Sequence, residues 1–249
     1  LAVDSRILSI SIKWETGPMG TEMQSPPPED TRRVETTKIL KRQWLSKNVF
    51  EIELSRPAAF EFKAGHTIRF IRQSIERYYS LLSSPNDANL ELCVQNVPEG
   101  RFSPILANAE IGSQFEFTGP HGYFTFKPSQ RAPVFVATGT GIAPFVSFAR
   151  SGIKNFALFH EARAAEELYY QSYFKKIKSA YHPCLPLSQA AVPKPEGMFQ
   201  GHVADCITAN LPPKTYDFYL CGHDEMIRSV TLLVDDRYPG SYVYTEVFF

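Results

Sequence analysis

The chain has no excess of either charge, because its 249 residues include 26 Lys and Arg and 26 Asp and Glu. This balance argues against a protein that binds nucleic acid or an anionic membrane surface, since both partners select basic patches. No apolar run reaches the roughly 18 residues of a membrane-spanning helix. The first residues, "LAVDSRILSISIKWE", are too polar for the apolar core of a signal peptide. We therefore expect a cytoplasmic protein without a membrane span.

Closely spaced metal ligands are also missing from the sequence. The four cysteines, Cys93, Cys184, Cys206 and Cys221, are too far apart for a zinc or iron–sulfur motif, and the six histidines show no HExxH pattern. Disulfides are uncommon in a chain of this size without a secretory signal. We expect four reduced thiols and no metal site.

Residues 34–127 consist of short β-rich segments separated by turn residues. The segments are "VETTKILKRQWL", "NVFEIELSRP", "HTIRFIRQ", "YYSLLSS", "LELCVQNV" and "SQFEFTGP". In "LELCVQNV" the apolar residues alternate, which places Cys93 on the opposite face from Leu92. Six such segments at short spacing predict an antiparallel β-barrel, with a short helix beginning at Ser103.

Residues 130–249 show a different pattern, in which compact apolar runs alternate with helical stretches. The runs end in small or polar residues, as in "VFVATGTG" and "YLCGHD", and the helical stretches include "AEELYYQSYFKKIK" at 165–178. This alternation predicts a parallel sheet with helices on both faces, which is an α/β domain. Residues 17–33 are rich in Pro, Gly and charge, so residues 1–33 are predicted to be a partly disordered N-terminal extension.

Two strand ends in this second domain could bind a ligand. Gly139, Thr140 and Gly141 follow an apolar strand and lead into a helix, where small residues let a pyrophosphate approach the backbone. Pro144 replaces the third glycine of the usual G-x-G-x-x-G, so this turn alone supports a ligand and a plain tight turn about equally. Cys221 ends a later strand, and by itself it would more often be a small buried side chain.

Six motifs follow one another along the chain: "RYYS" (77–80), "GRFS" (100–103), "GPHGYF" (119–124), "GTGIAP" (139–144), "CGHDEM" (221–226) and "YTEVFF" (244–249). In order and spacing they resemble the R-x-Y-[ST], G-x-x-S, G-P-x-G-x-F, pyridine-nucleotide, C-G-x-x-x-M and E-x-aromatic motifs of the ferredoxin–NADP reductase superfamily. The resemblance covers about Val34 to Phe249. It implies an FAD-binding β-barrel over 34–127 and an NAD(P)-binding α/β domain over 130–249.

The resemblance also implies contacts with FAD. Arg77 would pair with the FAD pyrophosphate, Tyr79 would stack on the isoalloxazine, and Ser80 would place its hydroxyl near flavin N5. Ser103 would offer backbone N–H groups to the same pyrophosphate. The further residues implied near FAD are Tyr78, Val94, Gln95, Gly100 and Phe102.

A second set of implied contacts concerns NAD(P)H. The residues that would cradle its pyrophosphate are Thr138, Gly139, Thr140, Gly141, Ile142 and Pro144. Cys221 would lie against the nicotinamide, and Gly222 and Met226 of the same motif are also implied near the coenzyme. Glu246 would sit near Ser80 and Cys221 and polarise or relay protons, so these three are the predicted catalytic residues. Phe248 would cover the flavin where nicotinamide must land, and Phe249 is the alternative.

The choice between NADH and NADPH stays open in the sequence. In "PLSQ" the position after Ser188 is Gln189, where NADPH-using relatives commonly have Arg for the 2′-phosphate. Arg163 is a cation that some relatives use for the same phosphate. Glu161 stands where many relatives have Gly, which would alter the turn near the nucleotide.

We expect the electron acceptor to be a separate molecule, because these 249 residues contain no plant-type iron–sulfur motif, haem domain or second flavin domain. Candidates are a ferredoxin, a flavodoxin, an oxygenase component, a cytochrome or a small molecule. The first hypothesis is a ferredoxin–NAD(P) reductase. The alternatives are an NAD(P)H:flavin or quinone reductase and a non-catalytic flavin-binding electron-transfer or regulatory subunit.

Overall fold

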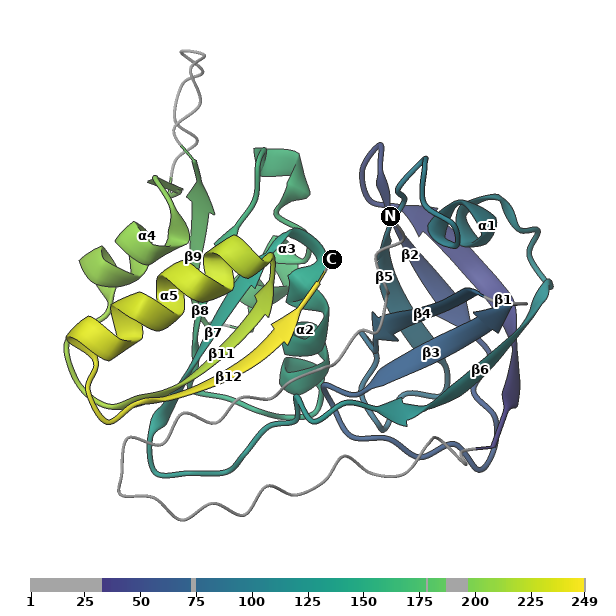
Figure 1. Cartoon of the computed structure of the whole chain (residues 1–249), viewed down its shortest axis with the longest axis horizontal. Helices are drawn as coiled ribbons and strands as arrows, with labels where there is room; N and C mark the ends of the chain where they lie inside the picture. Colours follow the sequence, from purple (N-terminus) through teal and green to yellow (C-terminus); the bar gives the residue numbers. More distant parts are fainter. Residues whose placement is uncertain (1–32, 73–74, 178, 187–196, 249) are drawn as a thin grey trace, which may run out of the picture.

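The structure is a computed structural model, and it describes residues 33–72, 75–177, 179–186 and 197–248. An antiparallel β-sheet domain lies beside a parallel-sheet domain with helices (Figure 1). The predicted fold class, a β-barrel followed by an α/β domain, is therefore confirmed. Among the described residues, no helix combines the length and apolar character that crossing a bilayer requires.

The first domain is one six-stranded antiparallel sheet in the order β4-β3-β6-β1-β2-β5. Its elements are β1 (Glu35–Trp44), β2 (Val49–Leu54), β3 (Thr67–Arg72), β4 (Ile75–Ser80), β5 (Leu90–Gln95), α1 (Ser103–Asn108) and β6 (Gln114–His121). Each β segment expected from the sequence overlaps one of these strands. A bridge between Leu81 and Leu92 brings the two edges of the sheet together, so the sheet curls into a barrel around a core of aromatic and aliphatic side chains.

The second domain is a six-stranded parallel sheet in the order β10-β9-β8-β7-β11-β12. Its strands are β7 (Ala132–Thr138), β8 (Ala157–Glu161), β9 (Ala180–Leu185), β10 (Phe199–Gln200), β11 (Tyr216–Gly222) and β12 (Tyr242–Val247). Its helices are η1 (Gly139–Ile142), α2 (Ala143–Arg150), η2 (Ala165–Glu167), α3 (Gln171–Lys176), α4 (Val203–Asn210) and α5 (Asp224–Arg237).

Helices cover both faces of this sheet, as the alternation of strands and helices predicted (Figure 1). Along β7, Phe135 packs in a cluster with side chains of α2 and α3. The next residue, Val136, packs in a cluster with α4 and α5 on the opposite face. Because both faces are covered, every residue of β11 is buried. The two-residue strand β10 was not anticipated.

The expected continuous helix over 165–178 is wrong. The chain forms η2, breaks at Tyr169 and Tyr170, and resumes as α3. Tyr170 adopts a left-handed backbone with φ of 60°, which ends any helix. Both tyrosine hydroxyls bond the barrel instead, Tyr169 to Ser46 (2.9 Å) and Tyr170 to Glu51 (2.8 Å). The local pattern favoured a helix, but these contacts to the other domain override it.

The two domains share an extended interface. Cys93 of β5 is buried although its face of the strand points out of the barrel, because the second domain covers that face. Arg150 of α2 donates to Glu91 of β5 at 2.5 Å. Ser147, also in α2, donates to the carbonyl of Ser83 at 2.6 Å. The interface therefore combines apolar packing with buried polar contacts.

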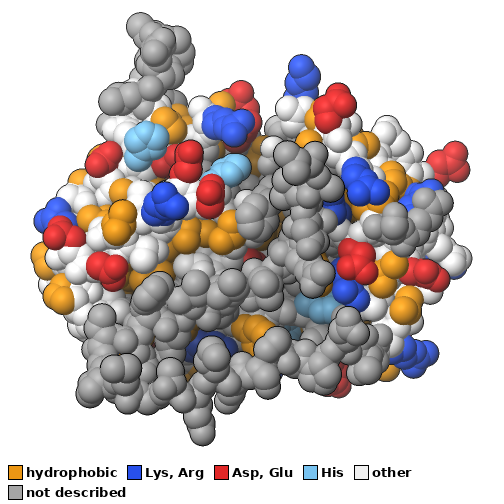
Figure 2. All heavy atoms as spheres, in the orientation of Figure 1, with side chains coloured by type: hydrophobic (Ala, Val, Ile, Leu, Met, Phe, Trp, Pro, Cys, Tyr) orange, Lys and Arg blue, Asp and Glu red, His pale blue; other side chains and the backbone are white. Residues whose placement is uncertain are grey.

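Charged side chains of both signs are interspersed over the face of the molecule displayed in Figure 2, within the coloured part of the chain. This distribution agrees with the equal numbers of basic and acidic residues in the sequence. On that displayed face, the described residues therefore form no broad region of a single charge.

Candidate active site between the two sheets

The end of β4 meets the ends of β11 and β12 at the boundary between the domains. Cys221 and Glu246 are register partners on neighbouring parallel strands. Ser80, the last residue of β4, donates its hydroxyl to Glu246 Oε2 at 2.8 Å, across 166 residues of sequence. Cys221 Sγ lies 3.9 Å from the same oxygen. The structure thus brings the three predicted catalytic residues together, and we call them the Ser80–Cys221–Glu246 cluster.

Burial sets the protonation of this cluster. Removal from water raises the pKa of Glu246 to about 7, although the bonds from Ser80 and Cys221 act in the opposite direction. Burial also raises the pKa of Cys221 well above its usual range, and the nearby Glu246 charge adds to this effect. The Cys221 side chain is therefore a neutral thiol rather than a reactive thiolate. Glu246 can take up or release a proton near neutral pH.

The strand before the cluster presents two aromatic residues on opposite faces. Tyr79 packs edge-on against Phe70, with ring centroids 5.8 Å apart, and burial raises its pKa, so the phenol stays neutral. Tyr78 packs edge-on against His121 at 5.3 Å. Arg77 shares the face of Tyr79 and donates to the carbonyl of Glu76 at 2.7 Å. A guanidinium and a flat ring are therefore aligned on one face of β4.

The turn before α1 is held by its own backbone and by one hydroxyl. Gly100 N–H donates to the carbonyl of Val97 at 2.8 Å, and Val97 N–H donates to Ser103 Oγ at 3.0 Å. A side chain at Gly100 would meet the Val97 carbonyl at 2.8 Å, so the turn requires glycine. Phe102 is buried in the barrel core. Of the other two residues predicted near FAD, Val94 is also buried in that core and Gln95 is exposed.

The glycine turn after β7 is pressed against the end of β11. A side chain at Gly141 would collide with the backbone carbonyl of Cys221, and one at Gly222 would collide with Thr138. Thr138 Oγ1 accepts a hydrogen bond from the His223 N–H at 2.9 Å. Gly139 has φ of 52°, and no atom lies within 4 Å of where its Cβ would be. The turn is thus anchored on one side and open on the other, which leaves room for a phosphate group to approach the backbone.

The other predicted nucleotide residues lie around this turn or outside the described residues. Ile142, Pro144 and Met226 are buried beside it. Arg163 is exposed in the loop after β8. Phe248 is half-buried, and its N–H donates to the carbonyl of Gly222 at 2.9 Å, so its backbone is tied to the "CGHDEM" loop. The predictions for Ser188, Gln189 and Phe249 fall outside the described residues.

His160 was missed by the sequence analysis. It is fully buried at the end of β8, and its Nε2 lies 3.2 Å from the carbonyl oxygen of Gly139. A histidine inside the apolar run "ALFHE" was the signal that could have identified it, because a buried imidazole needs polar partners.

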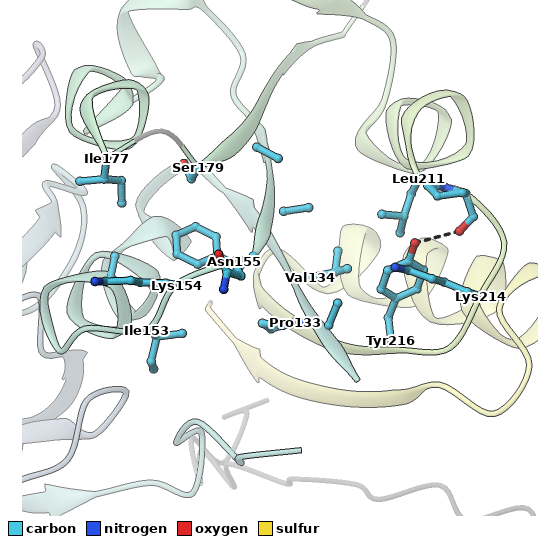
Figure 3. A pocket seen from close by; sticks show the side chains of 16 residues that line it. Pro133, Val134, Ile153, Lys154, Asn155, Ile177, Ser179, Leu211, Lys214 and Tyr216 are labelled. Carbon is cyan, nitrogen blue, oxygen red and sulfur yellow. Dashed lines mark hydrogen bonds between the residues drawn. The ribbon is translucent and has the colours of Figure 1, made fainter. Parts of the chain in front are cut away.

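A hollow of about 570 Å³ lies at the amino ends of the parallel strands, away from the Ser80–Cys221–Glu246 cluster (Figure 3). The residues that line it include Pro133 at the start of β7, Tyr216 at the start of β11, and the side chains of Ile153, Lys154 and Lys214. Ligands of parallel α/β sheets bind beyond the carboxyl ends of the strands. This hollow, at the amino ends, is therefore separate from the candidate site.

Comparison with known proteins covers both domains. Residues 36–126 match the family model of the oxidoreductase FAD-binding domain, and residues 135–231 match that of the oxidoreductase NAD-binding domain. Over 226 residues the chain is 29% identical to ferredoxin–NADP reductase B of Sorangium cellulosum (strain So ce56), covering 81% of this chain and 92% of that relative.

Two further relatives extend this picture. Over 210 residues the chain is 29% identical to the ferredoxin–NAD(P)(+) reductase component of the naphthalene 1,2-dioxygenase/salicylate 5-hydroxylase systems of a Ralstonia species. That match covers 80% of this chain but 63% of the relative, so the chain spans less than two thirds of its length. The fold is similar to a ferredoxin NADP+ reductase from Neisseria gonorrhoeae with bound FAD and NADP, with a TM-score of 0.75 at 23% identity over 87% of this chain and 99% of that one.

Proposed function

Because the chain belongs to the ferredoxin–NADP reductase superfamily, we propose that it oxidises NAD(P)H with bound FAD and passes the electrons to a ferredoxin-type carrier, a flavodoxin or an oxygenase component. The chain is an FAD-containing NAD(P)H oxidoreductase that works with a separate redox partner. The observation that carries the proposal is the buried Ser80–Cys221–Glu246 cluster. It joins the domain that binds FAD to the domain that binds NAD(P).

The residues at the site fit both cofactors. The guanidinium of Arg77 suits a diphosphate, the ring of Tyr79 suits a flat ring system, and the open side of Gly139 suits a second pyrophosphate. When bound, FAD accepts two electrons from NAD(P)H and can return them singly. The protein's contribution is to place the two cofactors against each other and to exclude water.

The cluster has three roles in this proposal. The Ser80 hydroxyl donates to Glu246 at 2.8 Å, so the second domain would hold this hydroxyl in place when a flavin is bound. The neutral thiol of Cys221 offers a soft, uncharged surface for the nicotinamide. Glu246, with a pKa of about 7, can take up or release a proton near neutral pH, and a relay through Ser80 would require the Ser80 hydroxyl to turn and accept from the carboxyl group.

The proposed partner class follows from the relatives. One relative is named as a ferredoxin–NADP reductase and another as the reductase component of an oxygenase system. Both names describe electron transfer to another protein. This supports a protein acceptor over a free flavin or quinone.

An anaerobic titration tests the proposal directly. The FAD-loaded protein is mixed with NADH and with NADPH, and the flavin absorbance is followed by stopped flow. The reduced protein is then mixed with a [2Fe–2S] ferredoxin, a flavodoxin, free FMN and menadione in parallel. We expect bleaching by at least one coenzyme and faster reoxidation by a carrier protein. An oxidised flavin that neither coenzyme bleaches would contradict the proposal, and faster turnover with FMN or menadione would identify a small-molecule reductase.

Arg163 provides a test of coenzyme choice. It is an exposed cation after β8, and some relatives use a cation at this position for the 2′-phosphate of NADPH. Arg163→Ala should lower kcat/KM for NADPH by about tenfold while leaving NADH within about twofold, because one charge-assisted contact is lost. The control is Arg237→Ala, which removes an exposed cation from the end of α5. An unchanged NADPH/NADH ratio would place the 2′-phosphate site elsewhere.

A further inference from the structure

His160 has a defined hydrogen-bonding state. Its Nε2 lies 3.2 Å from the carbonyl oxygen of Gly139, and its Nδ1 lies 3.2 Å from the hydroxyl of Tyr181 on β9. A carbonyl oxygen can only accept, so Nε2 carries the proton and donates to Gly139, while Nδ1 accepts from Tyr181. Burial lowers the pKa of His160 to about 4, so the ring is neutral at ordinary pH and keeps this tautomer.

The bond to Gly139 fixes the orientation of a whole peptide group. The carbonyl of Gly139 and the N–H of Thr140 belong to one planar trans peptide, so they point in opposite directions. His160 holds the carbonyl toward the interior of the sheet. The N–H of Thr140 is therefore directed away from His160. The i→i+3 bonds of η1 also restrain this peptide, but Gly139 has few steric limits on its backbone, so the imidazole donor is expected to narrow its orientation further.

The turn is thus held from two neighbouring strands. On the β11 side the backbone of Cys221 packs directly against Gly141, and the His223 N–H donates to Thr138. On the β8 side the contact is the imidazole of His160, which lies in register with Ala137 of β7. One side is held by backbone packing, and the other by a single side-chain donor.

We propose that His160 is a positioning residue for coenzyme binding, which anchors the Gly139 carbonyl so that the Thr140 N–H is presented to the pyrophosphate of NAD(P)H. This inference rests on the proposed function, because it requires the turn at 138–144 to bind the coenzyme. It adds to that function a buried residue of β8 that acts through the Gly139 carbonyl.

A matched pair of variants tests the proposal. His160→Gln places an amide nitrogen near the position of Nε2, so it can still donate to Gly139. His160→Asn is also polar, but its shorter side chain reaches only the position of Nδ1. Tyr181→Phe is the control, because it removes the hydroxyl at the other nitrogen and leaves the Gly139 bond. All three variants are compared with the wild-type full chain loaded with FAD.

The kinetics use whichever of NADH and NADPH reduces the wild-type flavin faster. They also use reduced nicotinamide mononucleotide, which lacks the pyrophosphate linkage. We expect His160→Asn to raise KM for the dinucleotide about three- to tenfold, with kcat within about twofold, because one hydrogen bond to the ligand is misdirected. Its kcat/KM with the mononucleotide should equal that of the wild type. His160→Gln and Tyr181→Phe should both stay near wild-type values.

Three results would overturn the proposal. The first is an unchanged KM in His160→Asn, and the second is an equal loss with the dinucleotide and the mononucleotide. The third is a His160→Gln variant that is as impaired as His160→Asn. Each would show that His160 supports the domain as a whole or has no role in the turn. Failure of the proposed function would appear differently, as a wild-type protein whose flavin neither coenzyme reduces.

Discussion

Among single residues, Glu246 is the one whose charge depends on the assembled fold. Its folded pKa of about 7 lies above the ordinary carboxyl value of 4.5. Between these values the folded protein holds a proton that the unfolded chain has released. The stabilisation by this group is therefore complete at low pH and is lost as the pH rises through 7, by at most about 3 kcal/mol.

Glu246→Gln should remove this pH dependence while keeping an oxygen that accepts from Ser80. We expect the free energy of unfolding of the variant to fall less than that of the wild type between pH 5 and pH 8. Urea denaturation at both pH values, with FAD in excess, measures the difference. Parallel pH profiles for the two proteins would show that Glu246 ionises normally.

Arg77 is the residue on which we expect FAD affinity to depend. Arg77→Ala should raise the dissociation constant for FAD about ten- to hundredfold, since a diphosphate would lose a charged donor. Fluorescence titration of the apoprotein with FAD measures it. Arg237→Ala removes the same charge from the other domain and should leave FAD binding unchanged. An Arg77→Ala variant that keeps its flavin through dialysis would remove Arg77 from the FAD site.

At the scale of elements, the contact between the β7 turn and the end of β11 leaves no room for a methyl group. Gly141→Ala should lower the free energy of unfolding by several kcal/mol and raise KM for the coenzyme, because the new Cβ collides with the Cys221 backbone. Gly139→Ala faces open space and should cost only about 1–2 kcal/mol, for its left-handed backbone. Thermal melting of the two variants tests this order of stability. Equal effects of the two substitutions would contradict it.

The helices and strands also differ in how well local sequence patterns predict them. Alternation and turn residues predicted the six barrel strands, because these depend on local patterns. The helix expected over 165–178 failed at Tyr170, because its partner Glu51 is 119 residues away. Cys93 is buried for a related reason, since the other domain covers its face of β5.

The order of the motifs predicted that Ser80, Cys221 and Glu246 lie together, but the raised pKa of Glu246 depends on burial in the packed structure. His160 had no motif to mark it.

At the scale of the whole molecule, Tyr170 connects the two domains. Its hydroxyl donates to Glu51 from a strained left-handed backbone. Tyr170→Phe should lower the free energy of unfolding by about 1–2 kcal/mol, because Glu51 loses a donor in a partly buried site. It should also slow flavin reduction while leaving FAD affinity unchanged, since the domain that carries the coenzyme is held less firmly.

The control for this prediction is Tyr173→Phe, three residues further along in α3. Tyr170 and Tyr173 both pack against the apolar cluster at the domain interface. Tyr173→Phe keeps the ring and removes only the hydroxyl. Chemical denaturation and stopped-flow reduction by NAD(P)H are measured for both variants. If the two behave alike, the Tyr170–Glu51 bond does not orient the domains.

The apolar cluster at the interface has a consequence for how the protein melts. It contains Val49, Leu82 and Cys93 from the barrel together with Phe135, Phe145 and Tyr219 from the parallel sheet. Either domain, if separated, would expose its share of these side chains to water at a cost proportional to their area. We therefore expect the two domains to unfold together, in a single calorimetric transition. If the chain is divided near residue 128, we expect each half to expose apolar surface and aggregate rather than fold as an independent domain.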